Sequence, residues 1–355
     1  MSSIRIAGAG PAGLAAAVVL AKTGWPVDVY ERNSDVGHRF NGDLQGLENW
    51  STDKNVLADL SAVGLEVNFH CAPFSAVTVT DGVNQETYDR GRPLFYLVKR
   101  GAMADSIDQG LKRQALAAGV TIEFNQKLDP ALAEIVATGP LHDKLVWVDK
   151  GLVFDTNLPD MAVGLPMDEA GYSGYGYLLV TKGHGCMCTV LFDQKSRIEE
   201  CFATVQSICS KLVNLDIQHP RSVGGTASFA LNNIWQRGNS RYVGEAAGLQ
   251  DFLWGFGIRA ALWSGWLAAQ SIIEQTSYPK LAGRMFADRN RAGVVNRYLW
   301  EKFRRRRNER VVRRIGRSAD PFAALRSFYT YNPLQRLLFP IALRHVRQRY
   351  PWLGR

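Results

Sequence analysis

The amino-acid sequence predicts an α/β protein: a mixed domain with a parallel sheet, an inserted lobe of antiparallel strands, and a helical C-terminal region. Three observations support this fold class. A strand, a glycine-rich turn, a helix and a second strand follow one another within residues 3–37. Strand-like runs replace this alternation between residues 150 and 241, and arginine-rich helical stretches follow residue 280. Alternating strands and helices are typical of parallel sheets, whereas successive strands joined by turns are typical of antiparallel ones.

Length and composition limit the class of protein. With 355 residues, 46% hydrophobic and 21% charged, the chain is long enough for about two domains and too apolar to be disordered. An odd number of cysteines, five, argues against the disulfide framework of a secreted protein, so a cytoplasmic protein with reduced thiols is expected. Cys186 and Cys188 would face the same side of a strand, but no second pair or histidine cluster stands near them, and no metal site is expected.

The sequence shows neither a targeting nor a membrane-spanning pattern. Glycines and a proline interrupt the apolar segment that begins at Ile4, which is not typical of a signal peptide. The longest later apolar stretch, Ile258–Ile273, contains Arg259 and is shorter than the ~20 residues that a spanning helix needs. A chain that does not cross a membrane is therefore expected.

The segment 3–37 contains a dinucleotide-binding fingerprint. Its glycines follow the order G-x-G-x-x-G between a strand and a helix, with an acid about 20 residues further on. The residues of the fingerprint are Gly8, Gly10, Pro11, Ala12, Gly13, Glu31 and Arg32. The first glycine would permit a tight turn, the second would let a pyrophosphate approach the backbone, and the third would let the helix pack closely on the strand. The helix N-terminus would offer amide donors and a positive dipole to the phosphates.

The acid at the end of the second strand narrows the choice of nucleotide. Glu31 would accept hydrogen bonds from a ribose diol and would disfavour a 2′-phosphate, so an NAD-like nucleotide or FAD is expected rather than NADP. The fingerprint alone does not distinguish these two. A glycine-rich turn in an unrelated α/β unit is the alternative interpretation.

A second motif lies in residues 241–270. A strand that ends at Val243 is followed by Gly244 and Glu245, and the turn Gly255-Phe256-Gly257 then begins a helix. The small residues of this helix, which would allow close packing, are Ala260, Ala261, Gly265 and Ala268. This segment resembles the flavin-contacting segment of the geranylgeranyl reductase group, within the superfamily of FAD-dependent aromatic hydroxylases.

The resemblance implies a Rossmann-like FAD-binding domain and assigns roles to several residues. Glu245 would bind the ribityl chain, although the family more often has Asp there, and Asp251 matches an acid between the two glycine elements. Gly255 and Gly257 would let the backbone approach the isoalloxazine, and the following helix would direct its dipole toward N1 and C2=O. Arg39 and Arg100 match arginines of the family, the first one reaching the FAD phosphates or ribityl chain. Single arginines are more often ordinary surface residues, so these two assignments depend on the resemblance.

The resemblance covers about residues 1–275 and is weakest in the middle. Many relatives carry a second Asp-Gly motif after the third strand of the FAD domain, whereas this chain has Ile135–Pro140, read as a strand and a Gly-Pro turn. A hydroxylase that uses reduced nicotinamide is less well supported for this reason. The expected domains are FAD-binding for 1–149 and 241–279, a substrate-binding β lobe for 150–240, and a basic helical region for 280–355.

Four strands are expected in the lobe: Leu152–Phe154, Met161–Leu165, Tyr175–Val180 and Met187–Phe192, with Lys182–Gly185 as the turn between the last two. They would form a small antiparallel sheet over the reactive face of the flavin. Tyr175 and Tyr177 would lie on one side of their strand and, with Trp254, are the candidate substrate-binding residues. Stacking inside the sheet's own core is the equally supported alternative for the tyrosines.

The positive charge is concentrated at the C-terminal end. Residues 280–355 hold 20 Lys and Arg against 4 Asp and Glu, while residues 1–279 hold 22 against 29. Four consecutive arginines occupy 304–307, and a helical apolar face with flanking arginines follows, which Pro340 is expected to kink or interrupt. The apolar residues of this face are Leu334, Leu337, Leu338 and Ile341. Attachment to a membrane surface and packing on the flavin domain are equally supported, an acidic protein partner less so, and nucleic acid is not expected because no recognised binding fold accompanies the charge.

These patterns together predict an FAD-dependent oxidoreductase that reduces a carbon-carbon double bond of a lipophilic, isoprenoid-like substrate by hydride from flavin N5. An FAD-dependent monooxygenase acting on an aromatic or activated substrate is the first alternative, and a non-enzymatic flavoprotein scaffold or maturation factor is the second. The catalytic residues are unknown, because no nucleophilic set stands at a recognisable spacing. Electrons would come from NAD(P)H, ferredoxin or a quinol, and a cytoplasmic location, with a peripheral site at the inner membrane surface as an alternative, is expected.

Overall fold

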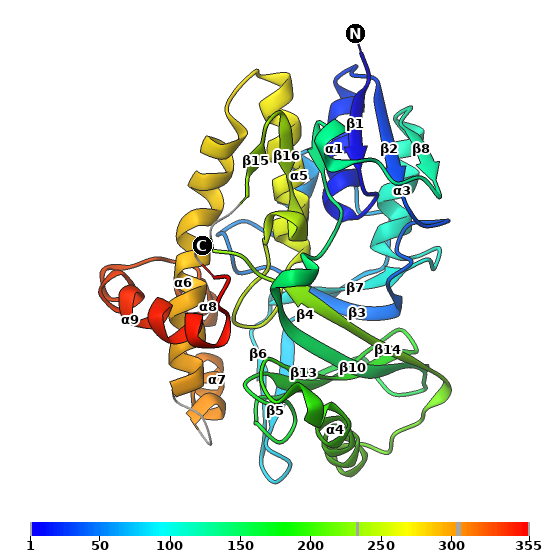
Figure 1. The fold of residues 1–355 in the computed structure, drawn as a ribbon. Coiled ribbons are helices and arrows are strands. Elements are labelled where there is room, and N and C mark those ends of the chain that lie inside the picture. Colours follow the sequence, from blue (N-terminus) through cyan, green and yellow to red (C-terminus); the bar gives the residue numbers. More distant parts are fainter. Residues whose placement is uncertain (1, 232–233, 303–306, 354–355) are drawn as a thin grey trace.

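The computed structural model describes residues 2–231, 234–302 and 307–353. Figure 1 shows a domain of parallel strands and helices, a lobe of long antiparallel strands below it, and the C-terminal helices along one side of both. This arrangement confirms the predicted fold class.

A six-stranded sheet forms the centre of the first domain. Its strands, in spatial order, are β15 (Gln236–Arg237), β16 (Ser240–Tyr242), β9 (Ile135–Val136), β1 (Ile4–Ala7), β2 (Val27–Glu31) and β8 (Thr121–Phe124). From β16 to β8 all neighbours pair in parallel, and only the edge strand β15 is antiparallel. Ile6 pairs with Val29 on one side and with Ile135 on the other, so the apolar alternation expected for the first strand lies in the centre of the sheet.

Three helices pack in this domain: α1 (Pro11–Lys22), α3 (Ile107–Ala117) and α5 (Ile258–Ile273). Proline is tolerated at the first position of α1 because the amide there needs no intrahelical partner. A Cβ atom on Gly265 would lie 2.1 Å from the carbonyl oxygen of Ala12, so α5 touches the backbone of α1. The close packing predicted for α5 is thereby confirmed.

The lobe is a seven-stranded sheet. Its strands, in spatial order, are β14 (Gln218–Ser228), β10 (Leu145–Asp155), β13 (His184–Leu191), β12 (Tyr175–Thr181), β11 (Met161–Leu165), β5 (Ala76–Thr80) and β6 (Gln85–Asp89). All neighbours are antiparallel except β11 and β5. Helix α4 (Ile198–Leu212) covers one face through Phe202 and Val205. The strands β5 and β6 come from a part of the chain expected to lie in the FAD-binding domain, and the expected boundaries stay a prediction.

A three-stranded antiparallel sheet connects the two parts. It consists of β3 (Asn41–Glu48), β7 (Phe95–Gly101) and β4 (Cys71–Phe74), and helix α2 (Val56–Ala62) follows β3. Short 3₁₀ helices are η1 (Pro130–Leu132), η2 (His142–Lys144), η3 (Lys195–Arg197) and η4 (Gly244–Ala247). The glycine of the last one follows β16 directly and brings the second sequence motif to the end of the parallel sheet.

The C-terminal region contains α6 (Tyr278–Lys302), α7 (Arg307–Gly316), α8 (Pro321–Ser327) and α9 (Pro333–Arg349). A kink or an interruption was expected at Pro340; the interruption is wrong, because α9 continues through this residue, and the kink stays a prediction. Ala342 and Val346, beyond the proline, are fully buried in a cluster with Val294 and Val295 of α6, and this packing offsets the missing backbone hydrogen bond. Residues 304–306 of the arginine run lie outside the described residues.

Many arginines of this region are bound to the rest of the protein. Arg297, on α6, is fully buried and donates hydrogen bonds to the carbonyl oxygens of Phe252 at 2.9 Å and Leu253 at 2.5 Å. Ion pairs between this region and earlier acids join Arg289 with Glu48, Arg313 and Arg317 with Glu86, Arg326 with Asp53, and Arg349 with Asp193. In the folded protein, the acids of residues 1–279 therefore neutralise part of the positive charge of residues 280–355. In the described part of the chain, no helix combines the length and apolar character needed to cross a membrane.

Candidate cofactor and active site

A cavity of about 500 Å³ opens where the three sheets meet, within the size range of ligand pockets. Most of the predicted cofactor residues line it: Gly8, Gly10, Pro11, Ala12, Glu31, Arg32, Arg39, Arg100, Gly244, Glu245, Gly255, Phe256 and Gly257. Gly13 does not, because it packs behind the turn, where a Cβ atom would lie 2.1 Å from the Gly8 carbonyl oxygen. The fold thus brings together two motifs that are more than 200 residues apart, and their roles stay predictions.

The glycine turn between β1 and α1 has the shape of a phosphate cradle. Gly8 has a φ of +102°, and a Cβ atom on it would lie 2.4 Å from the carbonyl oxygen of Ala137. Gly10 has no atom within 4 Å of its virtual Cβ, so the space above it is open. No side chain caps the N-terminus of α1, which leaves its first amides free to bind an anion in the cavity.

Glu31 is held at the end of β2. Its Oε2 accepts a hydrogen bond from the Ala9 amide at 3.0 Å, and its Oε1 accepts from the backbone and side-chain nitrogens of Asn33 at 3.0 and 2.6 Å. The carboxylate therefore fixes the glycine turn from the neighbouring strand. A carboxylate has about four acceptor sites, so capacity for a ribose hydroxyl is left.

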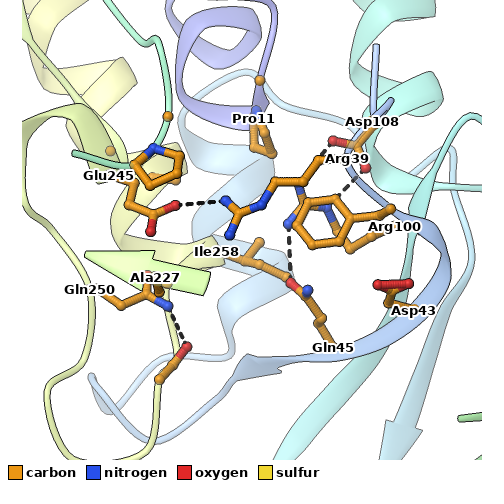
Figure 2. Close-up of a pocket in the computed structure, with 18 of the residues that line it drawn as sticks. Pro11, Arg39, Asp43, Gln45, Arg100, Asp108, Ala227, Glu245, Gln250 and Ile258 are labelled. Carbon is orange, nitrogen blue, oxygen red and sulfur yellow. Dashed lines mark hydrogen bonds and ion pairs between the residues drawn. The ribbon is translucent and has the colours of Figure 1, made fainter. Parts of the chain in front are cut away.

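Arg100 is fixed by an acid that the sequence analysis did not single out. Asp108, in the first turn of α3, accepts from Nε and Nη2 of Arg100 at 2.9 and 3.0 Å and from the Gly101 amide at 2.9 Å. Gln45 accepts from Nη1 of Arg100 at 3.1 Å (Figure 2). The guanidinium also lies over the Phe40 ring. The position of Asp108 in the first turn of the helix after Arg100 is the feature of the sequence that could have identified this partner.

Arg39 and Glu245 face each other across the cavity (Figure 2). Nη1 of Arg39 lies 3.1 Å from Oε2 of Glu245, and the Ser228 amide donates to Oε1 at 2.9 Å. Burial raises the pKa of Glu245, and the charge of Arg39 opposes this shift. Arg39 also donates to the carbonyl oxygen of Thr226, so it connects the first domain with β14.

The turn before α5 is shaped by close contacts. Gly255 has a φ of +80°, and a Cβ atom on it would lie 2.4 Å from the Trp147 ring. The side-chain amide of Gln250 donates to the Gly255 carbonyl oxygen at 2.7 Å. Asp251 does not line the cavity, and its carboxylate accepts from the amides of Leu253 and Trp254, so it shapes the turn. The N-terminus of α5 carries no side-chain cap, and its residues Gly257 and Ile258 line the cavity.

The predicted substrate-binding residues meet at one wall. Tyr175 and Tyr177 line the cavity with ring centroids 6.1 Å apart, and the Tyr175 hydroxyl donates to the Trp254 carbonyl oxygen. Burial raises the pKa of both tyrosines, so both are neutral. Tyr175 and Tyr177 therefore face the cavity, and a role in substrate binding stays a prediction.

Two further carboxyl groups in the cavity were missed by the sequence analysis. Burial raises the pKa of Asp149, on β10, to about 6, and the negative charge of Asp43 acts in the same direction. Burial also raises the pKa of Asp43, on β3. The alternation within Leu145–Asp155 could have placed Asp149 on the same face as Trp147, but only the tertiary structure shows that this face meets the cavity.

The paired cysteines lie on one side of β13, as expected. Their sulfur atoms are 3.7 Å apart, and the hydrogen bond with Cys186, together with burial, raises the pKa of Cys188. Both are reduced. Among the residues that the structure describes, no group of three or more His, Cys, Asp or Glu side chains could hold a metal ion.

Comparisons with known proteins agree with this geometry. Residues 6–47 match the family described as NAD(P)-binding Rossmann-like domain, and no curated protein gives a significant match. A geranylgeranyl bacteriochlorophyll reductase-like protein from Thermoplasma acidophilum is similar over 98% of both chains, with a TM-score of 0.69 and 14% identity. The flavin-dependent brominase Bmp2 covers 98% of this chain and 99% of its own, with a TM-score of 0.64 and 13% identity. The peptidyl tryptophan dihydroxylase QhpG covers 92% and 78%, with a TM-score of 0.59 and 19% identity.

At these identities the likeness shows the fold alone, a fold that this chain shares with a reductase-like protein and with a flavin-dependent brominase. The match to a Rossmann-like domain and the fold shared with a flavin-dependent protein are in keeping with FAD, the cofactor predicted from the sequence.

The residues present fit this cofactor. The open space above Gly10 and the uncapped α1 would take the pyrophosphate, and Glu31 would take the adenosine ribose. The pair of Arg39 and Glu245 would bind the ribityl chain, and the N-terminus of α5 would face the pyrimidine side of the ring. When bound, FAD supplies the two-electron chemistry, and the protein holds, orients and shields the reacting groups.

Proposed function

We propose that this protein is an FAD-dependent oxidoreductase that reduces a carbon-carbon double bond of a lipophilic, isoprenoid-like substrate. The wall that the seven-stranded sheet contributes to the cavity carries the proposal. This wall is almost entirely apolar or aromatic: Val77, Trp147, Ala162, Val163, Tyr175, Tyr177, Leu179, Cys188 and Val190. Such a surface favours a hydrocarbon substrate, because burying apolar area releases about 25 cal/mol per Å².

The likeness in fold to the reductase-like protein supports the reduction of a double bond. The cavity contains groups that would stabilise the reduced cofactor and hold the substrate. The α5 N-terminus, which lies behind the proposed ring site, would stabilise negative charge on the reduced cofactor. The rings of Tyr175, Tyr177 and Trp147 would hold the substrate and exclude water from the opposite side.

The test is anaerobic photoreduction of the purified holoprotein, followed by mixing with geranylgeraniol or geranylgeranyl diphosphate and, in parallel, with oxygen. Reoxidation by a prenyl lipid, with a product heavier by two hydrogens, is the expected result. If the reduced protein reacts rapidly with oxygen and not with the lipids, the reductase is excluded and a monooxygenase is supported. A flavin that stays reduced with both would favour the scaffold. Separate mixing of the oxidised protein with NADH, NADPH, reduced ferredoxin and a quinol would identify the electron donor.

We also propose that α9 attaches the protein to an anionic membrane surface. Leu334, Leu337 and Ile341 are 64%, 74% and 57% exposed, although they are large apolar side chains on one face of the helix. Arg336 and Arg344 are exposed beside them, and α9 contains no acidic residue. An apolar stripe flanked by arginines is typical of helices that lie on anionic lipid.

A further inference from the structure

Asp149 occupies a central place on the cavity side of the seven-stranded sheet. It pairs with Val190 of β13, and Val190 pairs with Tyr175 of β12, so these three side chains form a row on one face. Trp147, two residues before Asp149 on the same face, lies against the Gly255 turn. The carboxyl group is therefore next to the surface that faces the proposed flavin ring.

No other charged side chain from this sheet lines the cavity, among the residues that the structure describes. A carboxyl group on an apolar wall costs free energy unless it is paired or protonated. In the described part of the chain Asp149 forms no ion pair, since the guanidinium of Arg39 is engaged by Glu245 and the carbonyl oxygen of Thr226. Arg39 therefore acts on Asp149 through its charge, without forming an ion pair with it.

The charged groups around Asp149 come from three elements. Asp43, on β3, and Glu245, in η4, raise its pKa, whereas Arg39, after β2, and the Gly225 amide of β14 lower it. Burial has the largest effect on the pKa of Asp149, and it also raises this pKa. The carboxyl group therefore exchanges its proton near pH 6.

The ionisable side chains next to Asp149 on β12 and β13 do not exchange protons in this pH range. Burial raises the pKa of Tyr175 and Tyr177, and the hydrogen bond with Cys186, together with burial, raises that of Cys188. These groups keep their protons throughout the range in which Asp149 titrates. Asp149 is the acid on this wall that can both lose and regain a proton near neutral pH.

We propose that the carboxyl group of Asp149 is the proton donor of the reaction in this cavity. The inference rests on the proposed function. The O–H bond of Asp149 breaks and a C–H bond forms at one carbon of the substrate double bond, while reduced FAD supplies two electrons and a hydrogen as hydride at the other carbon. The double bond is reduced, the flavin is oxidised, and the carboxylate regains its proton from water in the cavity.

The test compares the full-length holoproteins of the wild type, Asp149→Asn and Asp155→Asn. Asp155 is a matched control, because it ends the same strand, is exposed and bonds to His219 outside the cavity. Asp149→Ser is a second variant without an acid, should Asp149→Asn fail to fold. The first measurement is the midpoint potential of bound FAD against pH. We expect the wild type and Asp155→Asn to share an inflection near pH 6 that Asp149→Asn lacks, while ionisation of the reduced flavin itself adds a bend that is common to all three proteins.

The second measurement is the single-turnover reoxidation of the photoreduced proteins by geranylgeraniol. We expect a rate lower by on the order of 100-fold in Asp149→Asn, with FAD affinity unchanged, since general acids contribute at least that much. A wild-type rate in Asp149→Asn, or a dependence of its midpoint potential on pH that is identical to that of the wild type, would overturn the proposal. If the inflection depends on Asp149 but the wild type reduces no prenyl lipid, the proposed function fails, and the proton donor serves another acceptor.

Discussion

The guanidinium of Arg39 and the carboxylate of Glu245 form an ion pair at 3.1 Å, although 206 residues separate them in the sequence. Arg39 follows β2, the second strand of the parallel sheet in the sequence, and Glu245 follows β16, the last strand of the same sheet. The pair lies in the cavity, where it would meet the middle of a bound FAD molecule.

Removing this arginine should weaken cofactor binding. In Arg39→Ala we expect the dissociation constant of FAD to rise by about tenfold or more, because a charge-assisted hydrogen bond is worth about 1.5–3 kcal/mol. Fluorescence titration of the apoprotein with FAD measures this change. Arg5→Ala is the control, since Arg5 pairs with Glu134 away from the cavity and should bind FAD as the wild type does. Equal affinity in both variants would contradict the assignment of Arg39.

The glycine turn allows folding and cofactor binding to be separated. Gly10→Leu should keep the melting temperature of the apoprotein, because no atom lies within 4 Å of its virtual Cβ, and should abolish FAD binding by filling the cavity. Gly8→Ala should lower the melting temperature as well, because its Cβ would clash with Ala137 at a positive φ. Thermal melting of both apoproteins and their flavin content after reconstitution test this. FAD bound normally by Gly10→Leu would place the cofactor elsewhere.

Asp149 should destabilise the apoprotein at neutral pH. Its pKa of about 6 exceeds the value of about 3.9 in an unfolded chain, so the folded state binds more protons and stability falls as pH rises from about 4 to 6. We expect Asp149→Asn to unfold at a higher urea concentration than the wild type at pH 8, by about 3 kcal/mol in free energy, and to lose this advantage at pH 4. If the difference in unfolding free energy between the two proteins did not depend on pH, the pKa of Asp149 would not be raised in the folded state.

The exposed face of α9 should bind anionic lipid. Leu337→Asp should reduce cosedimentation with vesicles of phosphatidylcholine and phosphatidylglycerol several-fold, with little change in melting temperature, because this side chain is 74% exposed. Val83→Asp is the control, since Val83 is 90% exposed in the turn after β5 and lies far from α9 in the sequence. Binding that is equal in both variants, or absent in the wild type, would contradict membrane attachment. Point variants are needed here, since deleting residues 280–355 would remove buried Arg297.

The local motifs were predictable because each depends on neighbours in the sequence. The turn at Gly8 and Gly10 and the small residues of α5 have the conformations and close packing expected for them, and Glu31 ends β2 as expected. These features are set by backbone conformation, apolar periodicity and helix termini, which act within a few residues. Pro340 is the exception, because packing of α9 on α6 outweighs the local cost of a proline.

The partners of the charged groups could not be predicted, since they come from distant parts of the chain. The sequence indicated Arg100 but not its partner Asp108, and it indicated Glu245 and Arg39 but not that they form an ion pair. It also showed the arginine-rich C-terminal region but not the acids that bind these arginines. Asp149 was one acid among many until the fold placed it on an apolar wall.

By itself, the sequence determined the fold class and the strand, glycine turn and helix of the Rossmann-like unit, because these follow from short motifs. Only the tertiary structure decided which of these groups share a cavity and how each is charged there. Burial and opposite charges set the pKa of a carboxyl group, and both are properties of its surroundings in space. That is why Asp149 and Glu245 acquire their chemical character only in the folded protein.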